Sequence, residues 1–217
     1  MAKVNKGILD GYIGKVGTVI GYFVHGKAIM RSASKSFTDA NTQKQQLVRT
    51  RFGALSALQS GFMPAVNMGM SRLARQQRNT PANCFVSRNW NAVSAFTPGE
   101  AEVDYSKIVV AEGNLPSVVF SAPSFEESLS VGATFVGNTD MGKATEIDDV
   151  YLFLYAPSTG QGMLGVPAHR SDQRIIVGVP SNWSGMKVHI YGFAVGRGAE
   201  NGGLVSHSSY LGSGTIA

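Results

Sequence analysis

The hydrophobic pattern of the chain changes at "TPGE", residues 97–100, and this change constrains the fold more than any other feature. Before it, from residue 42 on, apolar residues recur at steps of three and four, which is the spacing of one helical face. After it, short apolar runs are separated by turn residues, which is typical of strands. The sequence therefore predicts an α+β fold in two parts, residues 1–98 and residues 99–217.

The second part, residues 99–217, has the pattern of an antiparallel β-sandwich. Turn residues recur about every 10 to 15 positions, as in immunoglobulin- or fibronectin-like domains. One run, 187–195, alternates between two faces that are both largely apolar, which predicts a central strand or a strand that a partner covers. The expected strands are 105–113, 117–122, 128–137, 148–157, 174–180, 187–196 and 204–212.

The middle of the chain predicts three helices. The first begins at Thr42, whose side chain can form a capping box with Gln45. The second is expected to begin at Pro64 and to end at Gln77, because proline is favoured in the first turn of a helix. The third is expected over 83–96. The apolar residues that we expect in or beside the core, rather than around a cofactor, are Leu47, Val48, Phe52, Leu55, Leu58, Phe62, Met63, Val66, Met70, Leu73, Val86, Trp90 and Val93.

The N-terminal stretch 12–32 is typical of a glycine-rich β-hairpin, with a tight turn at His25–Gly26. It is not a phosphate-binding loop: in "GYIGKVG" only two residues separate the glycines, and valine follows the lysine where a hydroxyl residue would bind magnesium. No βαβ unit surrounds the glycines, so the dinucleotide-binding motif is excluded as well. We assign three glycines to backbone geometry, as bends, bulges or points of close approach: Gly14, Gly17 and Gly21.

Charge is distributed unevenly along the chain. Residues 1–90 carry 13 Lys or Arg against two Asp, an excess of +11, whereas residues 91–217 carry 6 bases against 12 acids, an excess of −6. Three interpretations stay open. In the first, the basic part binds a polyanion such as nucleic acid. In the second, the basic part docks on the acidic part of another copy. In the third, the two parts neutralise each other within one fold. The basic residues that we expect to make such contacts are Lys15, Lys27 and Arg31 on the hairpin, Arg49 and Arg51 on the first helix, and a ridge of Arg72, Arg75 and Arg78 on the second.

No residue pattern identifies a reaction. The four histidines are scattered, and the single cysteine, Cys84, can form neither an internal disulfide nor a zinc site. The adjacent acids Glu126–Glu127 and Asp148–Asp149 are poorly placed for paired catalysis, because neighbours on a strand point to opposite faces. We expect both pairs in solvated turns. The sequence thus predicts a protein that is not an enzyme and has no cofactor and no metal.

Four motifs, spread over nearly the whole chain, resemble an uncharacterised bacterial domain family of unknown function. Its pattern is G-x-x-G-K-V-G-x-V-x-G-Y-x-x-x-G-x-x-x-x-R at the start, Q-x-x-x-R-x-x-F on the helix, D-Y-x-K-x-x-x-x-x-G-x-L-P in the middle and S-x-S-x-Y-L-G at the end. The matching residues are Gly11, Gly14, Lys15, Val16, Gly17, Val19, Gly21, Tyr22, Gly26 and Arg31; Gln45, Arg49 and Phe52; Asp104, Tyr105, Lys107, Gly113, Leu115 and Pro116; and Ser206, Ser208, Tyr210, Leu211 and Gly212.

The resemblance implies no catalytic residue, and it implies a fibronectin-type or immunoglobulin-like sandwich in the second part. One departure is His207, which replaces a small polar residue in the last motif. A fold of this kind does not itself specify a function.

The features together favour a non-enzymatic structural protein that forms a homo-oligomer or a larger assembly, such as a virion, tail or filament component. One alternative is a nucleic-acid-associated protein that uses the basic part. Another is a surface or carbohydrate-binding module in which Trp183 stacks on a sugar, although a core position for Trp183 is the simpler expectation. No apolar stretch has the character of a signal peptide or the length of a membrane span. We therefore expect synthesis in the cytoplasm, with release in a particle or an extracellular assembly left open.

Overall fold

The computed structural model of the chain describes residues 3–4, 12–24, 26–34, 39–125, 129–139 and 142–217. The predicted turn residue His25 and the acidic pair Glu126–Glu127 lie outside these ranges. The chain divides into two compact units, Met1–Asn41 and Thr42–Ala217. The boundary that the sequence suggested, at residue 98, falls inside the second unit.

The first unit is an antiparallel sheet in the order β1-β2-β3-β4. Its strands are β1 (Lys3–Val4), β2 (Tyr12–Val16), β3 (Val19–Val24) and β4 (Lys27–Ser32). The predicted hairpin is present as the β3–β4 pair, and a further turn divides its first strand. Gly17, with φ +56°, occupies that turn between β2 and β3. Glycine adopts this left-handed conformation without steric strain, so the chain can reverse within two residues.

Helix α1 (Gln43–Gly69) begins as the sequence predicts and ends later than predicted. The Oγ1 of Thr42 accepts from the Gln45 N–H at 3.4 Å, and the Gln45 side chain accepts from the Thr42 N–H at 3.0 Å. The prediction that a second helix begins at Pro64 is wrong, because Pro64 lies inside α1. Proline removes one helical hydrogen bond, to the Ser60 carbonyl. Ser60 and Pro64 are both exposed, so water can satisfy that carbonyl, while the packing of neighbouring residues maintains the helix.

The other two helices are shorter than the sequence suggested. They are α2 (Ser71–Gln76) and α3 (Pro81–Arg88). The predicted helix over 83–96 is wrong in its second half, where β5 (Val93–Thr97) pairs with β6 (Glu100–Val103). Asn89 explains the early end of α3: its buried side chain donates to the carbonyls of Phe85 and Val109 and accepts from the Val109 N–H. These bonds fix the chain against a distant segment instead of continuing the helix.

Two antiparallel sheets form the sandwich-like part. One has the order β10-β9-β13-β14, with β11 also paired to β9, and the other has the order β12-β8-β7. The prediction that 187–195 is a central strand is confirmed, because β13 lies between β9 and β14 and is buried from Val188 to Ala194. The strands are β7 (Val119–Phe120), β8 (Ser130–Val136), β9 (Asp149–Ala156), β10 (Gln161–Leu164), β11 (Ala168–His169), β12 (Arg174–Gly178), β13 (Lys187–Val195) and β14 (Ser209–Thr215).

The predicted strand over 105–113 is not formed. A 3-10 turn, Tyr105–Lys107, begins there because the Asp104 carboxylate accepts from the Ser106 N–H. Further along, the N–H groups of Val110 and Ala111 donate to the Ser208 hydroxyl instead of to a neighbouring strand. An apolar segment whose donors are satisfied by a side chain does not need a strand partner.

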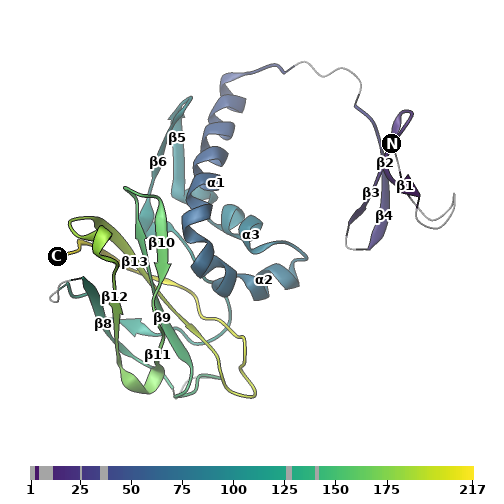
Figure 1. The fold of residues 1–217 in the computed structure, drawn as a ribbon. Coiled ribbons are helices and arrows are strands. Elements are labelled where there is room, and N and C mark those ends of the chain that lie inside the picture. Colours follow the sequence, from purple (N-terminus) through teal and green to yellow (C-terminus); the bar gives the residue numbers. More distant parts are fainter. Residues whose placement is uncertain (1–2, 5–11, 25, 35–38, 126–128, 140–141) are drawn as a thin grey trace. The chain divides into compact units, whose positions relative to one another are not determined.

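The five-stranded sheet forms the middle layer of the second unit, with the helices on one face and the three-stranded sheet on the other (Figure 1). Phe153 and Tyr155 of β9 pack toward Phe62 of α1, while Leu152 and Leu154 pack toward the other sheet. This alternation is expected of a strand covered on both faces. The predicted α+β class with a β-sandwich part is therefore confirmed, and the helices share a core with the strands.

Of the thirteen residues predicted in or beside the core, six are buried, five are half-buried and two are exposed. Leu55, Phe62, Val66 and Met70 have no exposed surface, but Val48 and Phe52 are each 54% exposed. The two exposed residues lie on the same helical face as Leu55 and Phe62, at steps of three, four and seven residues. Their exposure follows from their place in the first turns of α1, before its buried residues begin at Leu55.

Candidate interaction surface

The strand register of the first unit places three of the predicted basic residues on one face of its sheet. Lys15 of β2 lies opposite Ile20 of β3, and Ile20 lies opposite Arg31 of β4. Lys27 is on the same face, because alternate residues of β4 share a side. We call this side the basic face, and its described residues are Ile13, Lys15, Ile20, Tyr22, Val24, Lys27, Ile29 and Arg31.

The opposite side of this sheet carries no charged residue on β2, β3 or β4. We call it the apolar face, and its residues on these strands are Tyr12, Gly14, Val16, Val19, Gly21, Phe23, Ala28, Met30 and Ser32. A Cβ atom on Gly21 would collide with the carbonyl and the ring of Tyr12, so only glycine allows this close approach. Of the other two predicted glycines, Gly17 lies in the turn and Gly14 is in β2 with φ +115°.

Large apolar side chains are exposed on both faces. On the apolar face, Met30 is 57% and Val16 is 52% exposed, and on the basic face Ile13 is 52% exposed. Phe23, Val24 and Ile29 are exposed as well. Sheets in stable domains cover at least one face with a second layer, and the described part of this unit consists of strands alone. Exposed apolar surface of this kind is typical of interaction sites.

Strand β4 lies at the edge of this sheet, and all six of its residues are exposed. An edge strand presents unpaired N–H and C=O groups that can pair with a strand of another molecule. Lys27 and Arg31 lie on β4, on either side of Ile29 along the same face. The edge therefore combines free backbone groups, an apolar side chain and positive charge.

Two basic residues of the helical region contact other side chains of the same unit, and others are exposed on its surface. Arg88 forms an ion pair with Glu112 at 2.7 Å, and the guanidinium of Arg51 lies 4.6 Å from the centre of the Trp90 ring. Arg72 and Arg75 are exposed on α2. Arg78 lies beyond the end of that helix, with φ +52°, so the predicted three-residue ridge is not a continuous helical face.

The predicted basic residues of the first helix do not join those of the second. Arg49 is exposed near the start of α1, whereas Arg72 follows its end. Twenty residues of helix span roughly 30 Å. The helices thus carry basic groups at their two ends instead of one concentrated patch.

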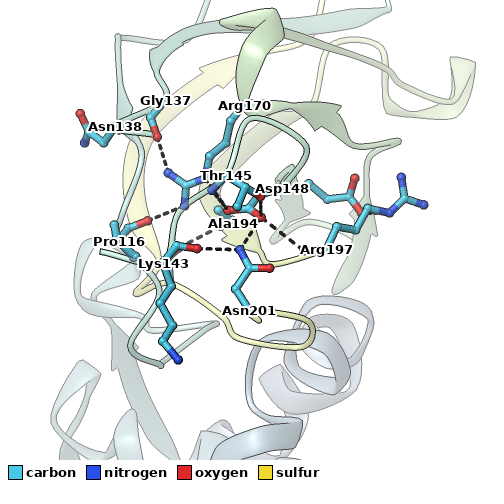
Figure 2. Close-up of polar contacts among 12 residues, drawn as sticks. Pro116, Gly137, Asn138, Lys143, Thr145, Asp148, Arg170, Ala194, Arg197 and Asn201 are labelled. Atoms are coloured by element: carbon cyan, nitrogen blue, oxygen red, sulfur yellow. Dashed lines mark hydrogen bonds and ion pairs between the residues drawn. The ribbon is translucent and has the colours of Figure 1, made fainter. Parts of the chain in front are cut away.

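Residues Asp148 and Asp149 are buried, so the prediction that they occupy a solvated turn is wrong. Asp148 pairs with Arg170 (Figure 2), and neither side chain has exposed surface. The Asp148 carboxylate accepts from the Thr145 N–H and hydroxyl, the Asn201 amide and the Arg197 N–H. Burial opposes the charge of Asp148, but these hydrogen bonds outweigh it and lower the pKa of Asp148 below its ordinary value.

Arg170 extends this buried cluster to two further loops. Its guanidinium donates to the carbonyls of Gly137 and Pro116, the latter at 2.6 Å (Figure 2). The carboxylate of the neighbouring Asp149 pairs with Arg197 at 3.3 Å, and its Oδ1 lies 3.6 Å from the Nδ1 of His169. Within the described residues, the groups that contact the Asp148 carboxylate are hydrogen-bond donors of the protein, so the arrangement is that of a structural ion pair. The sequence contained no local signal for it, because Arg170 lies 22 positions away.

Trp183, the residue that the sequence suggested as a sugar-stacking candidate, has a structural role. Trp183 is 3% exposed and packs in the sandwich core, so its ring is not available to stack on a sugar.

Within the described ranges, no three His, Cys, Asp or Glu side chains come together as metal ligands. No helix among the described residues is long and apolar enough to cross a membrane.

The fold and these surfaces define a class: an α+β protein with a layered β-rich body and a small separate sheet that exposes apolar side chains. Residues 11–212 match the profile of a family of unknown function, DUF6266, and the chain belongs to that family. The resemblance to an uncharacterised family is thereby confirmed. Neither the curated proteins nor the solved structures contain a significant match to the chain.

Proposed function

We propose that this chain is a non-enzymatic structural protein whose copies assemble through the N-terminal sheet, as in a virion, tail or filament component. One observation supports this proposal above the others. Six large apolar side chains are exposed on the two faces of a four-stranded sheet, in a unit whose described residues include no covering layer. A surface of this kind is stabilised when another molecule covers it.

A second copy of the chain is the occupant that the charges favour. The basic face carries Lys15, Lys27 and Arg31, whereas residues 91–217 have an excess charge of −6. Complementary charge guides association and sets its register. Strand addition at β4 would supply main-chain hydrogen bonds without any special side chain. Such a contact joins different surfaces of two copies, so it produces rings or open fibres.

Light scattering coupled to size-exclusion chromatography tests this proposal on the full chain. We expect the average mass to rise with protein concentration and to fall at high salt, where charge attraction is screened. Met30→Lys on the apolar face and Ile29→Pro on the edge strand should each reduce the mass toward that of a monomer. The matched control is Val166→Lys, at an 80% exposed apolar position of the second unit. A wild-type protein that stays monomeric at every concentration and salt would show the proposal to be wrong.

A second candidate function, association with nucleic acid, has one supporting observation. Residues 42–90 carry seven Lys or Arg and no Asp or Glu. Phosphate contacts by such groups weaken steeply as salt rises. In a filter-binding titration at low and high salt, this candidate requires binding at low salt that Arg72→Ala and Arg75→Ala together reduce. Absence of binding at low salt would exclude it.

A further inference from the structure

A polar cleft lies on the second unit. It has a volume of about 480 Å³ and is formed by the β5–β6 hairpin, the 3-10 turn Tyr105–Lys107 and strands β13 and β14. Small-molecule sites typically measure roughly 300–1,000 Å³. The cleft is thus large enough for a small ligand.

The floor of the cleft is held in place by aromatic and hydrogen-bonding contacts. The imidazole of His189 stacks on the ring of Tyr105, with centres 4.1 Å apart and planes 20° apart. Its Nδ1 lies 2.9 Å from the hydroxyl of Tyr210. The Tyr191 hydroxyl donates to the Tyr105 carbonyl at 2.8 Å, which fixes the backbone of that residue. The polar groups of the floor are therefore positioned before any ligand arrives.

The charges around the cleft cancel. Glu102 and Asp104 are acidic, and Lys107 and Lys187 are basic. Asp104 and Lys107 form an ion pair at 2.7 Å, whereas Glu102 and Lys187 have no ion-pair partner within the described part of the chain. Burial, together with the charge of Lys187, lowers the pKa of His189 to about 4. The imidazole is accordingly neutral near pH 7, with one nitrogen able to donate and the other able to accept.

The remaining lining groups favour a ligand with many hydroxyls. Ser94, Ser106 and Ser213 line the cleft beside the tyrosines. An anionic ligand would meet two carboxylates, and a cationic ligand would meet two ammonium groups. An apolar ligand would leave these polar groups without water or partners, which is unfavourable. A sugar has no net charge and can both donate and accept hydrogen bonds, and its apolar face can lie against an aromatic ring.

We propose that this cleft binds a neutral saccharide, with Glu102 and Lys187 as polar contacts and the His189–Tyr210 pair as its floor. None of the residues that line this site belongs to the N-terminal unit, and Trp183 is not among them. The proposal adds ligand recognition to a chain whose proposed role is assembly.

A panel of neutral and charged oligosaccharides immobilised on an array, followed by titration calorimetry with the best neutral oligosaccharide, tests the proposal on the full chain. We expect binding of neutral oligosaccharides, with affinity reduced at least fivefold by Glu102→Ala and by Lys187→Met. Both residues are exposed, so these substitutions leave the core intact. The controls Glu146→Ala and Lys143→Met, exposed outside the cleft, should bind like the wild type.

Three results would overturn the proposal: no binding to the array, binding of charged oligosaccharides only, or binding that both cleft variants leave unchanged. The Met30→Lys variant separates this test from the assembly proposal. If that variant no longer assembles and still binds the oligosaccharide, the two functions are independent. Failure of either experiment then leaves the other result valid.

Discussion

Asp148 and Arg170 form an ion pair from which solvent is excluded: the Arg170 Nε and the Asp148 Oδ2 are 3.1 Å apart, and neither side chain has exposed surface. The pair joins the start of β9 to the loops that carry Pro116 and Gly137. Both charges are neutralised by groups that come from distant parts of the sequence. The stability of this end of the sandwich therefore depends on their presence as a pair.

Removal of one partner should be strongly destabilising. Asp148→Ala leaves a buried guanidinium without its counter-ion, so we expect the free energy of unfolding to fall by about 3–5 kcal/mol. The double variant Asp148→Leu with Arg170→Met should lose less, because no charge is then left buried. Urea denaturation of the three proteins measures the difference. A single variant that is as stable as the exposed control Glu146→Ala would contradict the proposed role of the pair.

The stability of the second unit should depend on pH through His189. Burial and the charge of Lys187 lower the pKa of His189 from 6.5 to about 4 in the folded state. Between these values the unfolded chain binds a proton that the folded chain does not. Stability is therefore expected to fall as pH decreases from about 6.5 to 4, by up to about 3 kcal/mol.

Substitution of the histidine tests that pH dependence. His189→Gln should retain a polar side chain and flatten the pH dependence of the unfolding free energy between pH 6.5 and 4. His207→Gln, at an exposed position, is the matched control for the loss of an imidazole. Equal slopes for wild type and His189→Gln would show that the buried imidazole does not titrate as expected.

Helix α1 approaches β10 closely because Gly61 has no side chain. A Cβ atom at this position would collide with the Gly160 carbonyl and the Tyr155 ring. We expect Gly61→Val to destabilise the protein by about 1–3 kcal/mol through overpacking. Gly53→Ala on the same helix is a good control, since a Cβ atom there meets no atom within 4 Å. That change should instead stabilise the helix by up to about 1 kcal/mol, and thermal denaturation compares the two.

The thiol of Cys84 should be protected in the folded protein. The residue is 1% exposed in the core beside Phe85, and burial raises the pKa of the thiol. Only the thiolate reacts quickly with a disulfide reagent such as DTNB. We expect slow labelling of the native protein at pH 8 and rapid labelling in denaturant. Fast labelling under native conditions would mean that this part of the core opens readily.

The features that the sequence predicted correctly depend on neighbouring residues. The capping box of Thr42 and Gln45 is formed within four positions, and the two apolar faces of 187–195 are visible in one strand. The predicted order, with the helices before the strands of the sandwich, is also found: α3 ends at Arg88 and β7 begins at Val119. The predicted core position of Trp183 agrees with its burial.

The errors arise where a distant residue determines the local structure. Pro64 was expected to begin a helix, but core packing on both sides of it keeps α1 continuous. Residues 93–97 form a strand because β6 supplies a partner and Asn89 ends α3. In these segments the local preference is weak, and tertiary contacts outweigh it.

By itself, the sequence determined the α+β class, the family, the start of the long helix and the uneven distribution of charge, because each depends on residue types and short spacings. Only the tertiary structure decided that the helices share a core with the sandwich, that Asp148 is buried against Arg170 and that the cleft at His189 exists. These features join residues far apart in the chain, and no local periodicity records which distant groups will meet. The free energy that stabilises these features comes from the burial and pairing of side chains, and both exist only once the chain has folded.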